Sequence, residues 1–99
     1  MSKEGPDREF WDRADAVIHM ANKQCKHAPN GKVSSSLLYA AARFNAFIVA
    51  VKASNAEEIK SHKDEAINYF TEQYRKMLME NLDDYIENYD QYLKKPNTA

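Results

Sequence analysis

The chain has 99 residues, the length of one domain, and 43% of them are hydrophobic, which excludes wholesale disorder. Its formal net charge of -1 gives no general attraction to nucleic acid or to anionic membranes. One cysteine excludes an internal disulfide framework, and the opening MSKEGPDREF has no apolar core of the kind a signal peptide needs, so we expect a cytoplasmic protein.

The first helix is predicted over residues 6–28. Pro6 suits the first position of a helix, where its missing N–H has no partner to lose. Apolar residues then recur at spacings of three and four, which indicates one apolar face. They are Phe10, Ala14, Val17, Ile18, Ala21 and Cys25. Pro29 disfavours helix at Ala28, and Asn30-Gly31 is a turn signal, so we expect the chain to turn here.

The second helix is predicted over residues 34–53, with Ser34 as its N-cap. From Leu37 to Val51, 13 of 15 residues are apolar. A membrane-spanning helix needs about 20, and an arginine near its middle costs roughly 2.5–3.5 kcal/mol. The stretch is therefore interpreted as a buried central helix and not as a membrane span. Asn45 falls on its polar edge.

Arg43 falls among the apolar neighbours of this helix and needs a carboxylate or carbonyl partner there. Asp12, Asp15 or an acidic residue of the third helix could supply the carboxylate. Two interpretations stay open, a structural ion pair or an anion-binding residue in a pocket between helices.

The third helix is predicted over residues 56–94, opened by a capping box of Ser54 with Glu57 or of Asn55 with Glu58. At 39 residues it would be about 58 Å long, against about 30 Å for each of the others. It would therefore extend beyond the first and second helices, the only partners within its own chain. Either it breaks near residues 79–82 and folds back, or its C-terminal half meets a second subunit. No glycine or proline supports a break, so we favour the second alternative, with a homodimer as the simplest closed assembly.

An apolar seam follows the third helix in steps of three and four. It consists of Ile67, Phe70, Tyr74, Leu78, Leu82, Tyr85, Tyr89 and Tyr92. The expected fold is all-α and dimeric, a single domain of two short antiparallel helices packed on one long C-terminal helix, with flexible termini at residues 1–5 and 95–99.

EFWDRADAVIHMANKQC, followed by GKVSSSLLYAAARFNAF, resembles a family of short, mostly proteobacterial proteins known as a domain of unknown function. The resemblance covers Glu9 to Val51, and LLYAAARFNAF is its most distinctive part. It implies a bacterial, cytoplasmic helical protein. It brings no activity, cofactor or catalytic residue with it.

Three chemistries find little support in the sequence. Glu58, His62 and Glu65 share one helix face, but a metal site would need matching ligands on another helix, and neither shows them. Cys25 lies in an apolar stripe that does not face His27, which suits an inert thiol. The second helix offers alanine, phenylalanine and valine where a DNA-recognition helix needs polar side chains. We predict no catalytic residue, cofactor or metal.

The segment ENLDDYIENYDQY has five carboxylates and no cation, interleaved with tyrosines. It is interpreted either as a solvated face over a tyrosine seam or as a surface for a basic protein partner, where tyrosine supplies contact area and carboxylates supply steering. The candidate partner-binding residues are Asp83, Asp84, Tyr85, Glu87, Tyr89 and Tyr92.

The leading hypothesis is a non-enzymatic helical interaction or regulatory protein that acts through this segment. The alternative is a bundle that binds a small ligand or anion, and could be catalytic, centred on Arg43 with Tyr39 and an acidic residue of the first helix. A nucleic-acid regulator is the third hypothesis.

Overall fold

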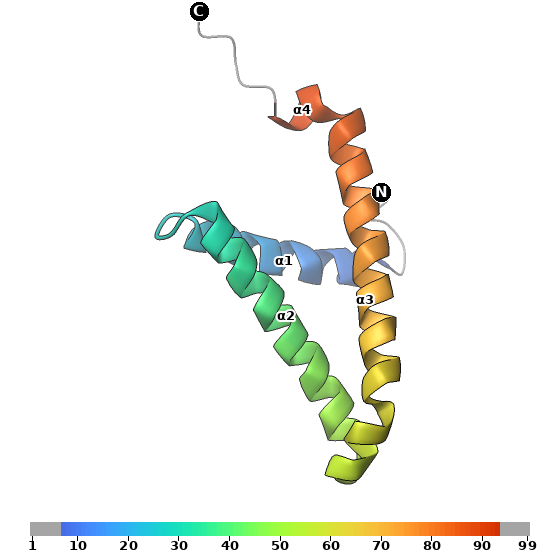
Figure 1. Ribbon diagram of the computed structural model, residues 1–99. Coiled ribbons are helices and arrows are strands. Elements are labelled where there is room, and N and C mark those ends of the chain that lie inside the picture. The colour runs from blue at the N-terminus through green and yellow to red at the C-terminus, as the bar shows by residue number, and fades with distance from the viewer. Residues whose placement is uncertain (1–6, 94–99) are drawn as a thin grey trace, which may run out of the picture. The chain divides into compact units, whose positions relative to one another are not determined.

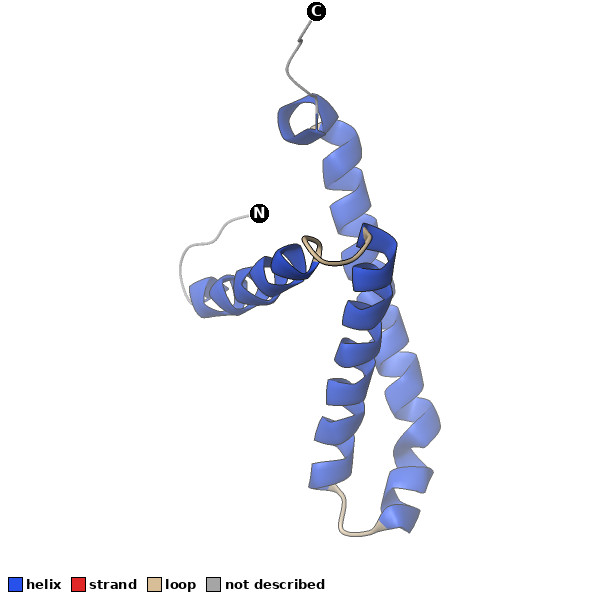
Figure 2. Ribbon diagram, turned by 90° about the vertical axis from the view of Figure 1, so that its left-hand side faces the viewer, coloured by secondary structure: helices blue, strands red, loops and turns tan. Residues whose placement is uncertain are grey.

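Residues 7–93 are described by the computed structural model, and every regular element among them is an α-helix (Figures 1 and 2). The elements are α1 (Arg8–Gln24), α2 (Asn30–Lys52), α3 (Ala56–Glu87) and the short α4 (Tyr89–Leu93). The all-α prediction is confirmed, with three long helices and a fourth that was not foreseen.

Residue contacts divide the chain into two units, Met1–Phe47 and Ile48–Ala99, so the boundary falls within α2. The single domain expected from the sequence stays a prediction. The helix start at Pro6, the flexible termini 1–5 and 95–99, and the last predicted helical residue, Lys94, lie outside the described residues.

The connection between α1 and α2 is displaced from its predicted place. α1 ends at Gln24 and not at residue 28, and the backbone of residues 25–27 turns, with the N–H of His27 donating to the carbonyl of Gln24 at 2.9 Å. α2 begins at Asn30, four residues before the predicted cap at Ser34.

Pro29 explains the early start of α2. Its carbonyl accepts hydrogen bonds from the N–H groups of Lys32 (3.0 Å) and Val33 (3.2 Å), so it occupies the position before the first helical turn. The fixed φ and missing N–H of proline cost nothing there. The turn predicted from Asn30-Gly31 is wrong because these residues form the first turn of the helix.

The connection between α2 and α3 follows one of the two predicted alternatives. Asn55 has an extended backbone (φ -164°, ψ 174°), and its side-chain oxygen accepts a hydrogen bond from the N–H of Glu58 at 2.9 Å. This is the N-cap geometry that satisfies one orphan donor of the first turn. Asn55, and not Ser54, therefore caps α3.

α3 runs without interruption through residues 79–82, so the chain does not fold back there. It ends at Glu87, and the prediction of one helix to residue 94 is wrong because Asn88 leaves the helical conformation (φ -115°, ψ 30°) before α4 begins. Figure 1 shows α4 turning away from the axis of α3. At 1.5 Å per residue, α3 is about 48 Å long, α2 about 34 Å and α1 about 26 Å.

None of the side chains described is buried, and large apolar side chains are exposed on each long helix. α2, predicted to be a buried central helix, contains no buried residue. Asn45 is half-buried and Arg43 is exposed, the reverse of the expected arrangement. Among residues 7–93, α2 is also long and apolar enough to cross a membrane, judged by length and composition alone.

Candidate functional site

The C-terminal end of α3 is organised around Asp84. The side-chain nitrogen of Asn88 donates to the Asp84 carboxylate at 2.8 Å and to its backbone carbonyl at 3.3 Å, and the backbone N–H of Asn88 donates to the same carbonyl at 2.9 Å. Asparagine can thus end a helix without glycine or proline, because its side chain forms local hydrogen bonds to groups one turn earlier, here the carbonyl and the carboxylate of Asp84. These bonds fix the residue at which the chain leaves α3.

α4 brings a second tyrosine back to this end of α3. The N–H of Tyr92 donates to the carbonyl of Asn88 at 3.1 Å, which forms the single turn of α4. The ring of Tyr92 then packs edge-on against that of Tyr85, with centroids 5.3 Å apart and planes at 65°. This arrangement is one that aromatic pairs prefer.

Asp84 also acts on the Tyr92 hydroxyl. The negative charge of the carboxylate, and secondly a hydrogen bond to it, raise the pKa of Tyr92 above its ordinary value of 10.0, because both disfavour a second negative charge nearby. Of the six candidate residues, the structure therefore brings together Asp84, Tyr85 and Tyr92.

The other three candidates lie outside this cluster. Asp83, Glu87 and Tyr89 are exposed and make none of the contacts that join Asp84, Tyr85 and Tyr92. Tyr85 and Tyr92 remain 47% and 49% exposed, so their paired rings offer contact area beside the carboxylate of Asp84. That combination suits recognition of a protein surface more than chemistry on a small substrate.

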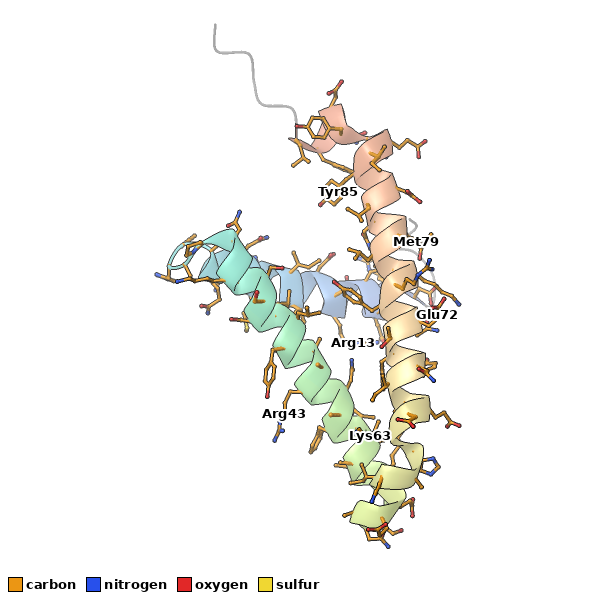
Figure 3. All side chains as sticks on the ribbon, viewed as in Figure 1. Arg13, Arg43, Lys63, Glu72, Met79 and Tyr85 are labelled. Carbon is orange, nitrogen blue, oxygen red and sulfur yellow. The ribbon has the colours of Figure 1, made fainter. Side chains whose placement is uncertain are left out.

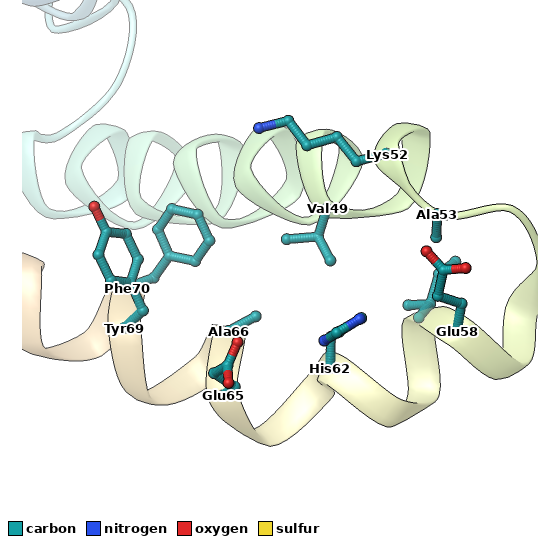
Figure 4. Close-up of a pocket in the computed structure, with 10 residues that line it drawn as sticks. Val49, Lys52, Ala53, Glu58, His62, Glu65, Ala66, Tyr69 and Phe70 are labelled. Carbon is teal, nitrogen blue, oxygen red and sulfur yellow. The ribbon is translucent and has the colours of Figure 1, made fainter.

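A groove lies where α2 ends and α3 begins (Figure 4). Its volume is about 520 Å³, within the range of small-molecule sites. Apolar side chains from both helices line it, among them Val49, Ile59 and Phe70. Polar groups border it, namely Lys52, Glu58, His62, Glu65 and Tyr69.

The three residues weighed as metal ligands, Glu58, His62 and Glu65, all border this groove. Within residues 7–93, however, no group of three His, Cys, Asp or Glu side chains is placed to hold a metal ion. The groove could not be predicted from the sequence, because its walls come from two helices joined by a turn and only the fold brings them together.

The candidate ligand residues Arg43 and Tyr39 are both exposed on α2, and Tyr39 is 69% exposed (Figure 3 labels Arg43). Arg43 has no ion pair within the described range. Asp12, one carboxylate expected to pair with it, lies 4.0 Å from Arg8 instead. Neither Arg43 nor Tyr39 lines the groove.

Asn88 is the residue that sequence reasoning missed at this site. The signal was available, since asparagine is a weak helix former that is favoured just past helix ends. It was outweighed by the absence of glycine and proline from Ala56 to Lys94.

Together, the helices and the surface at the end of α3 define a small all-α protein without an assigned chemistry. The chain belongs to the family described as protein of unknown function DUF3144, whose model matches residues 10–86. This confirms the resemblance seen in the sequence and extends it well beyond Val51.

A solved relative agrees with this assignment. An NMR structure of the protein NB7890A from Shewanella sp. is 34% identical in sequence and has a TM-score of 0.74. The match covers 92% of this chain and 95% of that one. No curated protein matches the chain. These comparisons therefore assign no function to the chain.

Proposed function

We propose that the chain is a non-enzymatic interaction protein of the bacterial cytoplasm that acts through its helix surfaces and assembles as a homodimer. The observation that carries the proposal is burial. No described side chain is buried, while large apolar side chains are exposed along α1, α2 and α3. Folding depends on removing apolar surface from water, so a partner that covers these exposed faces would stabilise the chain.

The lengths of the helices support a second copy as that cover. At 1.5 Å per residue, α3 is about 48 Å long, against about 34 Å for α2 and about 26 Å for α1. Neither of the other long helices is therefore long enough to cover the whole of α3, and a second copy of the chain would supply further apolar surface.

The cluster of Asp84, Tyr85 and Tyr92 lies at the C-terminal end of α3 and supports a role for this end as a contact surface. Tyrosine is enriched at the centres of protein interfaces, and carboxylates steer a basic partner towards them. A basic surface is accordingly the complement that this end of α3 would recognise.

The groove beside α2 and α3 favours a second candidate function, the binding of a small amphipathic molecule. Its apolar lining would hold the body of the ligand, and Lys52, His62 or Glu58 its polar end. This relocates the small-ligand alternative away from Arg43. Shifts of the His62 and Phe70 resonances on addition of small molecules would test it.

We assign no membrane role to α2. Arg43 lies near its centre, where inserting an arginine into a bilayer costs roughly 2.5–3.5 kcal/mol, and Asn30, Lys32 and the three serines 34–36 are polar residues of its first two turns. Recovery of the chain with the membrane fraction of lysed cells would contradict this.

Sedimentation equilibrium over the micromolar range tests the proposed dimer. The expected mass is twice that of one chain, with dissociation on dilution. A chain that remains monomeric at high micromolar concentration would overturn the proposal, because its apolar faces would then be covered within one copy.

A further inference from the structure

The groove at the end of α2 and the start of α3 is bordered by two carboxylates, Glu58 and Glu65, and both belong to α3. They are seven residues apart in the sequence. They therefore lie within about 20° of each other around the helix and about 10.5 Å apart along it. One wall of the groove thus carries two carboxylates in line with the axis of α3.

Neither carboxylate has a basic neighbour on its own helix. Side chains three or four positions apart are neighbours on a helix, and the positions at those distances from Glu58 and Glu65 hold no lysine or arginine. The other carboxylates of residues 56–72 do have such a neighbour, namely Glu57 and Asp64 (Lys60) and Glu72 (Arg75 and Lys76). The two carboxylates at the groove also form no ion pair within residues 7–93.

Two basic side chains, Lys52 and His62, border the same groove. Figure 4 shows the side chain of Lys52 following α2 away from Glu58, and in the part of the chain described Lys52 pairs with neither carboxylate. His62 lies between the two carboxylates along α3 and forms no ion pair with them. The α3 wall of the groove is therefore acidic, and an acidic wall favours a cationic ligand over an anionic one.

Apolar side chains line the rest of the groove. Ile59 and Ala66 come from α3, and Val49 and Ala53 point towards α3 from α2 (Figure 4). All four are half-buried. The complement of this surface is a molecule with a positive charge at each end and an apolar middle.

We propose that the groove binds a linear diamine, with one ammonium on Glu58, the other on Glu65 and the alkyl chain against Val49, Ile59 and Ala66. The alkyl chain passes the ring of His62, which lies between the two carboxylates. The inference rests on the proposed binding of a small amphipathic molecule in this groove, and it names the class of that molecule.

The separation of the carboxylates sets the length of the ligand. Side chains on a helix all lean towards its N-terminus, so Glu58 and Glu65 keep their axial separation of about 10.5 Å at the carboxylates. An extended alkyl chain grows by about 1.25 Å per bond, from bonds of about 1.5 Å and angles near 111°. The nitrogens of α,ω-diaminoheptane are therefore about 10 Å apart, whereas those of α,ω-diaminopropane are about 5 Å apart and reach one carboxylate at a time.

NMR titration of the full chain with four probes tests the proposal, followed at the resonances of His62 and Phe70. α,ω-Diaminoheptane should bind about 2- to 5-fold more tightly than heptylamine, which has the same chain and lacks one ion pair. It should bind about 10-fold more tightly than α,ω-diaminopropane, which lacks four methylenes. Heptanoate, an anion with a similar chain, should bind more weakly than heptylamine.

Substitution of the carboxylates tests their assignment. Glu58→Gln and Glu65→Gln should each weaken α,ω-diaminoheptane by about 2- to 5-fold and remove its advantage over heptylamine. The matched control is Glu57→Gln, which changes the first turn of α3 as Glu58→Gln does but does not border the groove. It should change the affinity by less than about 1.5-fold. Circular dichroism shows whether each variant keeps its helices.

The outcomes separate the diamine from the groove itself. Equal affinities for α,ω-diaminoheptane and heptylamine, tighter binding of heptanoate, or an effect of Glu57→Gln as large as that of Glu58→Gln would each overturn this inference. The groove would still be a small-molecule site in those cases. If none of the four probes moves the resonances of His62 and Phe70, both the diamine and the proposed function of the groove are wrong.

Discussion

Removing the cap of α3 should destabilise the chain by a calculable amount. The side chain of Asn55 accepts one backbone hydrogen bond, from Glu58 at 2.9 Å, at a helix end that has few other acceptors. Replacing such a cap by alanine costs about 1 kcal/mol, within a range of about 0.5–2 kcal/mol. Asn55→Ala should therefore lower the free energy of unfolding by about 1 kcal/mol, and Asn55→Asp, which keeps an acceptor, should change it little.

The assay is urea unfolding followed by helical circular dichroism at one fixed chain concentration, because the proposed dimerisation would contribute to the apparent stability. In thermal unfolding, the same loss corresponds to about 4–8 °C for a domain of this size. The matched control is Ser54→Ala, expected to cost under about 0.5 kcal/mol since Ser54 does not cap the helix. A Ser54→Ala variant as unstable as Asn55→Ala would refute this account of the turn.

Two further predictions concern exposed charged groups. Asp84→Asn should lower the pKa of Tyr92 towards 10.0, as read from tyrosinate absorbance against a Tyr92→Phe reference. Since the folded pKa is the raised one, any stability from this contact is present below about pH 10 and lost as pH rises through the raised value. Arg43→Ala should change the free energy of unfolding by under about 0.5 kcal/mol in denaturant titration, whereas a loss above 2 kcal/mol would reveal a buried ion pair.

Local signals in the sequence predicted the helices better than their boundaries. The cap at Asn55 was foreseen because it depends on a side chain and a backbone N–H three residues apart. The turn at Asn30-Gly31 was not, because the same dipeptide fits the first turn of a helix once Pro29 supplies the preceding position. Asn88 was missed because its effect depends on a bond to Asp84 and not on its identity alone.

The candidate site was predictable in part for a related reason. Tyr85 and Tyr92 were recognised by their spacing along one continuous helix, yet they meet because the helix stops between them. The groove was invisible because Val49 and Phe70 lie 21 positions apart and approach only through the turn. The predicted burial of α2 is wrong because the periodicity identifies an apolar face without identifying what covers it.

If the chain forms the proposed dimer, the lack of any buried side chain among residues 7–93 makes its stability depend on its abundance. A chain that buries its apolar side chains only in a dimer has a stability that depends on its concentration. Each tenfold fall in concentration removes about 1.4 kcal/mol from the assembled state. A cell that makes few copies would hold mostly incomplete chains, open to proteases. A cell that makes many copies would hold mostly dimers, which resist proteases. The amount of dimer would then rise steeply above a threshold expression level and would not be proportional to it.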